Sequence, residues 1–451
     1  MSQNKKKTKI QSLAQAYHPK LAAEVSRRQM LQSGVSLCGY STMSSLFGSP
    51  FAQAQTYTVQ RRLVWINMRG GWDILEITDP KPSSTSGIDM SYSWDLANQI
   101  AGGGTNDRVG RWLTRLASQQ GQDMVVVRGL NMGTTSHMAG SVYMDTGLLD
   151  NTGQVNSASI PAIVASESAA TIPIIQLNGG SDPLTDRGLL NPVSVVRAQN
   201  LDLYRSMYPD SDAALAQKLL ILDHLNSSIA SRQSIRGTND RLSDLATAEA
   251  KVRVQFQNNV GAQLALTDTD TAPFAVAPPQ NLDSGMTEAF ALALKMLKNN
   301  LVSCVNLGMG GFDTHANQER SMQPRVESFD YLLSTFMNEL RTAGQLDNTL
   351  IVVYSDFGRT PKINGRNGRD HWPFGGALML GGGIAGGRVV GATDDDLRGL
   401  NINSTTGAID SSGINLNPTH LCGSVLELTL GSSYLSLRNY LQSIPALTQV
   451  A

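Results

Sequence analysis

Short apolar runs rich in β-branched residues recur along the chain, and stretches with helical spacing of apolar residues lie between several of them. Such runs are typical of strands that are buried on both faces, and they cover Leu63–Met68, Met124–Val127, Ile172–Leu177, Leu301–Leu307 and Thr349–Tyr354. Helical patterns over Met286–Leu297 and Arg325–Leu340 precede the last two runs. This alternation predicts an α/β protein with a mostly parallel sheet sandwiched by helices.

Three later segments lack strand signals. A long polar, helix-prone stretch at about residues 214–262 predicts a helical insertion within a single α/β domain that spans residues 60–451. The Pro-containing segment Thr267–Gln280 predicts a linker. Residues 392–417 are rich in Gly, Asn, Asp and Ser and predict a loop.

Residues 1–54 have the organisation of an export signal. They hold seven Lys or Arg and one acidic residue, and the pair Arg27-Arg28 precedes a weakly apolar run over residues 30–47 and the sequence AQA at residues 52–54. This order predicts a twin-arginine signal, and hence a periplasmic or secreted protein that meets the twin-arginine translocation machinery. The apolar run is too short and polar to predict a transmembrane span. The alternative is a basic tail in which two arginines happen to be adjacent.

Composition narrows the class of protein further. The 451 residues include 36 Lys or Arg and 37 Asp or Glu, so the net charge of −1 gives no indication of nucleic acid binding. A hydrophobic content of 41% is that of a globular protein. Three cysteines exclude a disulfide framework, and sequence alone does not show whether Cys304 and Cys422 pair.

Polar motifs follow four of the predicted strands. Because ligands bind beyond the carboxyl ends of parallel strands, these positions are the first candidates for a functional site. Three of the six histidines lie in them: His137, His315 and His371. The motifs are RGGWD at residues 69–73, TTSH at 134–137, GGFDTH at 310–315, and SDFGRT at 355–360 with RDHW at 369–372.

Three of these motifs supply carboxylates, namely Asp73, Asp313 and Asp356. If the strands are neighbours, each pair of carboxylates at ~4 Å costs about 4 kcal/mol at an effective dielectric of about 20, and a bound divalent cation removes that cost. Imidazoles beside carboxylates favour zinc or manganese over calcium or magnesium. In an extended segment Asp313 and His315 point the same way. With His371 they form a three-ligand set that leaves a position open.

Each motif also has a structural explanation. An Asp after a strand often forms a turn or caps a helix, and a Gly pair often only permits a tight turn. His371 beside Trp372 fits a packed core histidine, and His420 follows Pro418-Thr419, which predicts a capped surface helix rather than a metal ligand. The combination of motifs favours metal binding over a series of unrelated structural roles.

The motifs together resemble those of the DUF1501 family of proteins of unknown function. The resemblance covers essentially residues 60–431 and includes a Gly-rich stretch over residues 380–391. It implies membership of the alkaline phosphatase and sulfatase superfamily, an alkaline-phosphatase-like fold and a metal-dependent hydrolase of phosphate or sulfate esters. The substrate would be a small-molecule or polymer-linked ester. The matching segments are NMRGGWD at 67–73, GGFDTH at 310–315, SDFGRT at 355–360 and KINGRNGRDHWP at 362–373.

The resemblance also implies roles for individual residues. Asp313, His315 and His371 would bind a catalytic metal, and Asp73 and Asp356 would bind a second one. The sequence departs from related phosphatases at Phe357, where those enzymes often have a histidine, so the second metal would lack a ligand. This departure, with the uncertain nucleophile, motivates an alternative function: a non-catalytic envelope binding protein that retains the fold.

The segment around Ser136 is where the resemblance implies a nucleophile. Sulfatases place a Cys or Ser before a helix that ends in Thr-Gly, and Thr146-Gly147 ends the corresponding segment here. We expect Ser136 rather than Thr135 to be the nucleophile and His137 to be a ligand or an acid/base. Arg359 or Arg69 would stabilise charge on the transferred group. The segment has no Cys, which argues against a formylglycine sulfatase, and the structural alternative is that Ser136 only caps the next helix.

Overall fold

The computed structural model describes residues 61–82, 84–150, 155, 157–181, 195–197, 211–236, 240–257, 260–279 and 282–451. The predicted export signal, with Arg27 and Arg28, lies outside these residues. Among the described helices, none combines the length and the apolar character that crossing a membrane requires.

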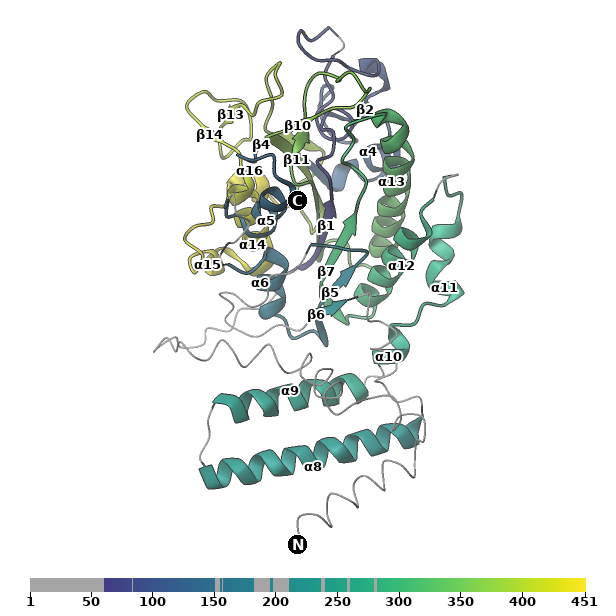
Figure 1. Ribbon diagram of the computed structural model, residues 1–451, viewed down its shortest axis with the longest axis vertical. Helices are drawn as coiled ribbons and strands as arrows, with labels where there is room; N and C mark the ends of the chain where they lie inside the picture. The colour runs from purple at the N-terminus through teal and green to yellow at the C-terminus, as the bar shows by residue number, and fades with distance from the viewer. Residues whose placement is uncertain are drawn as a thin grey trace. The chain divides into compact units, whose positions relative to one another are not determined.

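An eight-stranded sheet forms the centre of the α/β unit (Figure 1). All neighbouring strands are parallel except β11, which runs antiparallel to β4 and β8. The predicted mostly parallel sheet between helices is therefore confirmed. In sheet order the strands are β12 (Arg388–Val390), β4 (Met124–Asn131), β11 (Phe374–Gly381), β8 (Thr349–Tyr354), β1 (Arg62–Met68), β7 (Val302–Met309), β5 (Ile172–Leu177) and β6 (Val195–Arg197).

All five predicted strands are present, but β11 was not predicted. Its sequence, FGGALMLG, has the glycine content of a loop. In the sheet those glycines allow close packing, because a Cβ on Gly376 would lie only 2.5 Å from Oγ1 of Thr78. A tertiary contact therefore explains a composition that conceals the strand from sequence analysis.

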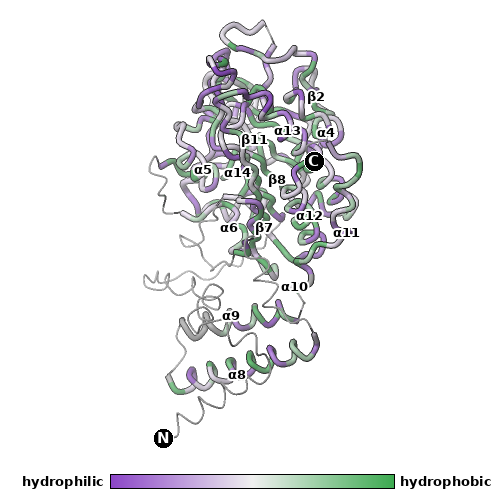
Figure 2. The backbone as a smooth tube through the Cα atoms, turned by 45° about the vertical axis from the view of Figure 1, so that its right-hand side comes forward, coloured by the Kyte–Doolittle hydropathy of each residue, from purple (hydrophilic) through white to green (hydrophobic). Residues whose placement is uncertain are grey.

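Helices cover both faces of the sheet, with α12 and α13 on one side and α5, α6 and α14 on the other (Figure 1). Side chains of β1 alternate between two hydrophobic clusters, so Val64 and Ile66 face one helical layer and Leu63 and Trp65 face the other. Segments of hydrophobic residues accordingly lie at the centre of the α/β unit (Figure 2). The helices are α4 (Thr114–Gln119), α5 (His137–Thr146), α6 (Ile160–Ser166), α12 (Ser284–Lys298), α13 (Gln318–Thr342), α14 (Pro418–Leu430), α15 (Ser432–Leu435) and α16 (Pro445–Thr448).

The predicted linker at Thr267–Gln280 is wrong for residues 268–275, which fold into α11 (Asp268–Thr271) and the 3-10 helix η5 (Ala272–Ala275). A capping box between Thr267 and Asp270 begins α11, and Lys295 of α12 binds Asp270 at 2.7 Å. The remaining short elements are η2 (Trp94–Leu96), β2 (Asn98–Gln99), β3 (Arg108–Val109), η3 (Gly121–Asp123), β9 (Gly358–Arg359), β10 (His371–Trp372), β13 (Asn401–Ile402) and β14 (Ile414–Asn415).

The segment predicted as a helical insertion contains α8 (Asp212–Arg236), α9 (Asp240–Gln257) and α10 (Val260–Gln263). Residues 217–253 belong to a compact unit of their own. Within it Arg253 of α9 binds Asp223 of α8 at 2.9 Å and Glu249 at 2.6 Å. The pair with Asp223 joins the two helices, and the pair with Glu249 lies within α9.

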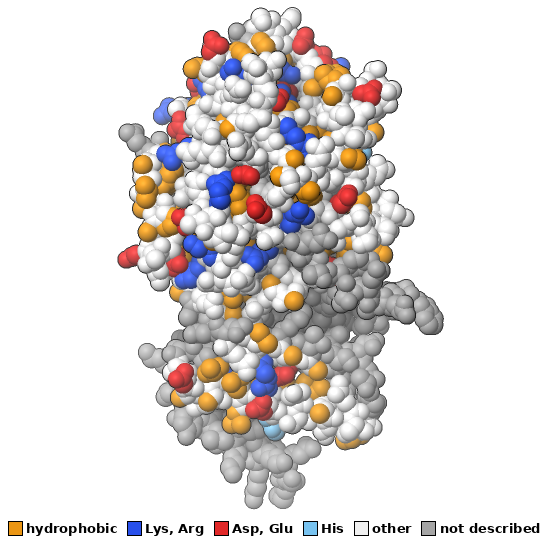
Figure 3. Space-filling view, turned by 180° about the vertical axis from the view of Figure 1, so that it is seen from behind, with side chains coloured by type: hydrophobic (Ala, Val, Ile, Leu, Met, Phe, Trp, Pro, Cys, Tyr) orange, Lys and Arg blue, Asp and Glu red, His pale blue; other side chains and the backbone are white. Residues whose placement is uncertain are grey.

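The C-terminal helix α14 is buried, not at the surface as predicted. His420 is part of its capping box, where Nδ1 accepts a hydrogen bond from the backbone N–H of Asn417 at 3.3 Å. Cys422 on this helix and Cys304 on β7 are both buried and unpaired with each other, and burial raises the pKa of both thiols. On the face shown in Figure 3, basic and acidic side chains are interspersed, as expected from the balanced composition.

Candidate metal centre

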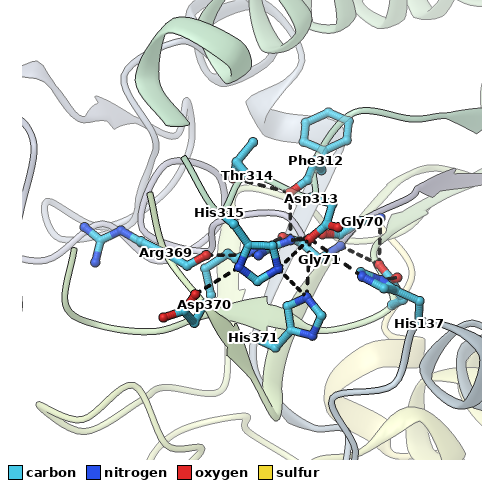
Figure 4. A network of polar contacts seen from close by, with 12 residues as sticks. Gly70, Gly71, His137, Phe312, Asp313, Thr314, His315, Arg369, Asp370 and His371 are labelled. Atoms are coloured by element: carbon cyan, nitrogen blue, oxygen red, sulfur yellow. Dashed lines mark hydrogen bonds and ion pairs between the residues drawn. The ribbon is translucent and has the colours of Figure 1, made fainter. Parts of the chain in front are cut away.

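Three histidines surround one carboxylate at the carboxyl end of the sheet (Figure 4). The segment after β7 carries Asp313 and His315, β10 begins with His371, and α5 begins with His137. Oδ1 of Asp313 lies 3.1 Å from Nε2 of His315, 3.3 Å from Nε2 of His371 and 3.7 Å from Nε2 of His137. The structure thus brings together residues that are up to 234 positions apart, from His137 to His371.

The other nitrogen of each imidazole faces a group that only accepts hydrogen bonds. Nδ1 must therefore carry the hydrogen, which leaves the lone pair of a neutral ring on Nε2, directed toward Asp313. Such partners on the remote nitrogen are typical of metal-binding histidines. The partners are the Asp356 carboxylate for His137, the Asp370 carboxylate at 2.9 Å for His315 and the Thr135 carbonyl at 3.0 Å for His371.

In neutral rings these lone pairs are close enough together to bind one cation. Nε2 of His315 and Nε2 of His371 are 3.0 Å apart, and Nε2 of His137 is buried without a hydrogen-bond partner. Ligand atoms around a tetrahedral zinc with bonds of ~2.0–2.1 Å are separated by about 3.3 Å, close to the spacing found here. Within the described residues, His137, Asp313 and His371 form a group that could hold a metal ion, since one ligand atom of each lies within 4.8 Å of the others. The residues present therefore fit a divalent metal.

Asp356 orients His137 instead of joining the cluster around Asp313. Its Oδ2 binds Nδ1 of His137, and its Oδ1 accepts hydrogen bonds from the backbone N–H groups of Gly70 at 3.0 Å and Gly71 at 2.6 Å and from the Ser355 hydroxyl at 2.9 Å. Every carboxylate oxygen is thus occupied within the protein. These contacts suit a residue that positions His137, whereas we expected Asp356 to be a direct ligand.

The Gly-Gly pair is needed because other chain segments approach it closely. Both residues have positive φ, +119° at Gly70 and +71° at Gly71. A Cβ on Gly70 would lie 2.4 Å from the backbone nitrogen of Asp313, and one on Gly71 would lie 2.4 Å from the ring of Phe357. The glycines therefore let β1 present its N–H groups to Asp356 while the Asp313 segment packs against it.

Asp73 lies apart from the cluster, contrary to the expectation of a second metal site. It is fully buried, and its Oδ2 pairs with Nε of Arg369 at 2.9 Å and accepts from Gln318 at 2.5 Å. Its Oδ1 accepts from the backbone N–H of Leu75 at 2.9 Å. An arginine thus neutralises the carboxylate, and among the described residues neither Asp73 nor Asp356 belongs to a group of three or more possible metal ligands.

Arg359 is also placed differently from the expectation that it contacts a transferred group. Its side chain is fully buried, and it donates to the carbonyls of Gly71 at 2.6 Å and Arg369 at 3.0 Å and to Oδ1 of Asp313 at 2.6 Å. Further bonds reach the carbonyls of Gly70 and Phe312. Because its N–H groups donate to acceptors within the protein, Arg359 holds together the chain segments that form the site.

Charge around the cluster shifts two pKa values. Burial raises the pKa of the Asp313 carboxyl group, but hydrogen bonds from Arg359 and His371 outweigh it, so the net pKa is lowered. The hydrogen bond with Asp356 raises the pKa of His137, although burial opposes this effect. Both shifts favour the charged forms in the protein without metal.

Phe357 is the residue at which we expected the second metal to lack a ligand. Its buried ring packs against His137 and His371, with ring centroids 4.6 and 4.5 Å apart. The ring therefore supports two of the imidazoles and offers no ligand of its own.

Ser136 caps α5, with its hydroxyl accepting from the backbone N–H of Ala139 at 3.5 Å. It is exposed and directly precedes His137, and the carbonyl of Thr135 binds His371. Ser136 therefore caps the helix, and its hydroxyl also lies next to a residue of the cluster.

The fold and this site define an α/β protein with a candidate metal centre at the carboxyl edge of its sheet. The chain belongs to the family described as protein of unknown function (DUF1501), whose model matches residues 60–406. The comparison with curated proteins gives no match.

Solved structures with similarity to this chain come from the alkaline phosphatase and sulfatase group. A protein in the alkaline phosphatase superfamily from Vibrio parahaemolyticus is 11% identical, with a TM-score of 0.35 over 95% of this chain and 78% of that one. The lipoteichoic acid synthase LtaP from Listeria monocytogenes is 10% identical, with a TM-score of 0.36 over 89% and 78%. The PsFucS1 sulfatase from Pseudoalteromonas sp. is 10% identical, with a TM-score of 0.33 over 95% and 77%.

Proposed function

We propose that this protein is an exported metal-dependent hydrolase of phosphate or sulfate esters. The observation that carries the proposal is the set of Nε2 lone pairs directed at Asp313, with Nε2 of His137 buried and without a hydrogen-bond partner. Imidazole lone pairs and a carboxylate oxygen are ligands that a divalent cation takes, so their convergence at one point supports a metal there.

His137, Asp313 and His371 would hold the metal, and His315 lies beside two of them. Mixed nitrogen and oxygen ligands favour zinc or manganese over calcium or magnesium. When bound, such a metal supplies Lewis-acid chemistry, which polarises an ester oxygen and lowers the pKa of a nearby hydroxyl or water.

The site is accessible to a substrate. The side chain of Asp313 is 50% exposed and that of Asp370 is 56% exposed. An ester attached to a small molecule or to a polymer can therefore approach the cluster from solvent.

Two groups beside the cluster suit an anionic ester. Ser136 would act as the nucleophile from the N-cap of α5, where backbone N–H groups favour a negative charge. Arg69, at the end of β1, is exposed, and in the described part of the chain its guanidinium makes no hydrogen bond or ion pair. Arg69 therefore replaces Arg359 as the residue we propose to bind the transferred group.

Location is proposed from the sequence of residues 1–54. The Arg27-Arg28 pair, the apolar run and the AQA sequence favour export in folded form by the twin-arginine machinery to the periplasm or beyond. An enzyme that collects its metal before export would fit this route.

Elemental analysis of the purified mature protein tests the site and the class together. We expect about one equivalent of zinc or manganese in the wild type and none in the variant with both Asp313→Ala and His371→Ala. His224→Ala is the matched control, because His224 is an exposed histidine on α8. Asp356→Asn should weaken metal affinity by about 10–100-fold, as loss of an orienting partner does. Unchanged metal content in the double variant would contradict the assignment.

Turnover is tested with chromogenic phosphate monoester, phosphodiester and sulfate ester substrates. We expect at least one class to be hydrolysed by the metal-bound wild type and none by the double variant. The capping role of Ser136 supports a second candidate function, a non-catalytic envelope binding protein. A metal-bound protein that is inert toward all three classes would favour that second function.

A further inference from the structure

A second candidate site lies outside the metal centre. It is a cavity of about 310 Å³ lined by Asp79, Pro80, Lys81, Pro82, Trp94, Asn106 and Arg128. None of these residues belongs to the histidine cluster around Asp313, and the volume is of the order found for small-molecule pockets.

A buried carboxylate in this cavity has an unused acceptor. Asp79 is 1% exposed, and its Oδ2 accepts from the Thr393 hydroxyl at 2.5 Å. Its Oδ1 lies 3.3 Å from Nε of Arg128, but that N–H group donates to the Thr78 carbonyl at 2.8 Å. Oδ1 therefore has no hydrogen-bond partner in the described residues. A buried acceptor of this kind favours a ligand that donates to it.

The same cavity has two cationic side chains with N–H groups that make no hydrogen bond in the described residues. Nζ of Lys81 donates to the Thr393 carbonyl at 3.0 Å and lies 3.4 Å from Oδ2 of Asp79, so one of its three hydrogens is free. Arg128 donates from Nε to the Thr78 carbonyl and from Nη2 to the Arg108 carbonyl at 2.6 Å. Its Nη1 has no partner in the described part of the chain. Two cations face one carboxylate, so the lining residues have an excess of positive charge.

Apolar groups form the rest of the lining. The indole of Trp94 has the Arg108 guanidinium over its ring at 5.1 Å, and Pro80 and Pro82 add rigid apolar surface. A ligand that fits this lining has an apolar face for the indole and hydroxyl groups that both donate, to Asp79, and accept, from Lys81, Arg128 and Asn106. A sugar ring meets all these requirements, and the excess of positive charge favours an acidic sugar over a neutral one.

We propose that this cavity binds a saccharide unit that carries a negative charge. Asp89, which lies between the lining residues Pro82 and Trp94 in the sequence, accepts through its carbonyl a hydrogen bond from Arg369, and Arg369 directly precedes Asp370 and His371. The cavity would thus hold the sugar part of an acidic glycan whether or not the metal centre is catalytic.

Binding of D-glucuronate and D-glucose to the full-length protein tests the proposal, because these sugars differ only in a carboxylate. Calorimetric titrations are run with and without excess EDTA, so that binding of the carboxylate to a metal is recognised by its loss on chelation. We expect glucuronate to bind about tenfold more tightly than glucose in both conditions. Since chelation leaves this result unchanged, the proposal can fail separately from the proposed hydrolase.

Variants then locate the site. Trp94→Ala should weaken the binding of both sugars by about tenfold, and Lys81→Met should remove the preference for glucuronate. Leu96→Ala is the matched control, because Leu96 lies in the same 3-10 helix, is exposed and does not line the cavity. Circular dichroism confirms that each variant is folded. Equal glucuronate affinity in the wild type and the folded Trp94→Ala variant, or no binding by the wild type, would overturn the proposal.

Discussion

Aspartates around the metal centre have different roles although their motifs look alike. Asp313 faces the imidazoles, while Asp356 and Asp370 accept from Nδ1 of two of them. Asp73 is neutralised by Arg369. Each role is set by a partner from another segment, so the sequence identified the carboxylates as candidates and could not distinguish a ligand from its support.

Glu76 is a buried carboxyl group that makes stability depend on pH. Burial, and then the charge of Asp73, raise its pKa from 4.5 to about 7, although Ser91 and Arg111 stabilise the charged form. The folded state therefore retains a proton that the unfolded state releases from about pH 4.5 upward. The contribution of Glu76 to stability is fully present below pH 4.5 and is lost as the pH rises through 7.

We expect the free energy of unfolding of the wild type to fall by up to about 3 kcal/mol between pH 4.5 and 7.5 because of Glu76. In Glu76→Gln, which keeps the side-chain shape, that part of the decrease should vanish. Urea denaturation across this range measures it. Burial raises the pKa of Asp330 to about 6, so Asp330 also lowers the free energy of unfolding as the pH rises. The contribution of Glu76 is therefore the difference in the free energy of unfolding between the wild type and Glu76→Gln at each pH. Parallel curves for the wild type and the variant would contradict the assignment.

At the scale of elements, the site is built where chain segments leave the sheet. The Gly-Gly turn after β1 gives two N–H groups to Asp356, the segment after β7 supplies Asp313 and His315, and β10 supplies His371. Helix α5 places His137 in its first turn and packs tightly there, since a Cβ on Gly140 would lie 2.1 Å from the Asp356 carbonyl oxygen. The position of α5 therefore decides whether His137 reaches the cluster.

The cap of α5 allows the structural and the chemical roles of Ser136 to be separated. Ser136→Asn keeps an effective N-cap without the hydroxyl, Ser136→Thr keeps both, and Ser136→Ala loses both at a cost of about 1 kcal/mol. If Ser136 is the nucleophile, ester hydrolysis should be lost in the Ser136→Asn variant and retained in the Ser136→Thr variant, with metal content unchanged in both. Thermal denaturation and turnover measure the two roles. Hydrolysis by the Asn variant at the wild-type rate would assign Ser136 to capping alone.

For the whole molecule, the order of the strands explains why the motifs meet. The carboxyl ends of β8, β1 and β7 are adjacent, and β4 ends at the same edge because β11 runs antiparallel between β4 and β8. A metal held by His137, Asp313 and His371 would join segments from three parts of the chain. It would bind the folded state alone, so it would add to global stability.

Chelation should therefore lower the melting temperature. A metal present at about 100 times its dissociation constant stabilises the folded state by about 2.7 kcal/mol, and for a domain of this size EDTA should lower the transition by several degrees. The variant with Asp313→Ala and His371→Ala should melt at one temperature with or without EDTA. Differential scanning calorimetry measures both. An equal shift in the variant would place the metal elsewhere.

The sequence by itself determined the five predicted strands, the main helices and which segments carry the chemistry, because apolar periodicity and strand-end motifs are local signals. Tertiary structure alone decided that β11 completes the sheet, that Phe357 supports the imidazoles, and that Asp73 and Arg359 are used internally. It also decided that His137 faces Asp313. These outcomes depend on close approach between residues far apart in the chain, and side-chain charge, burial and hydrogen bonding follow from that approach.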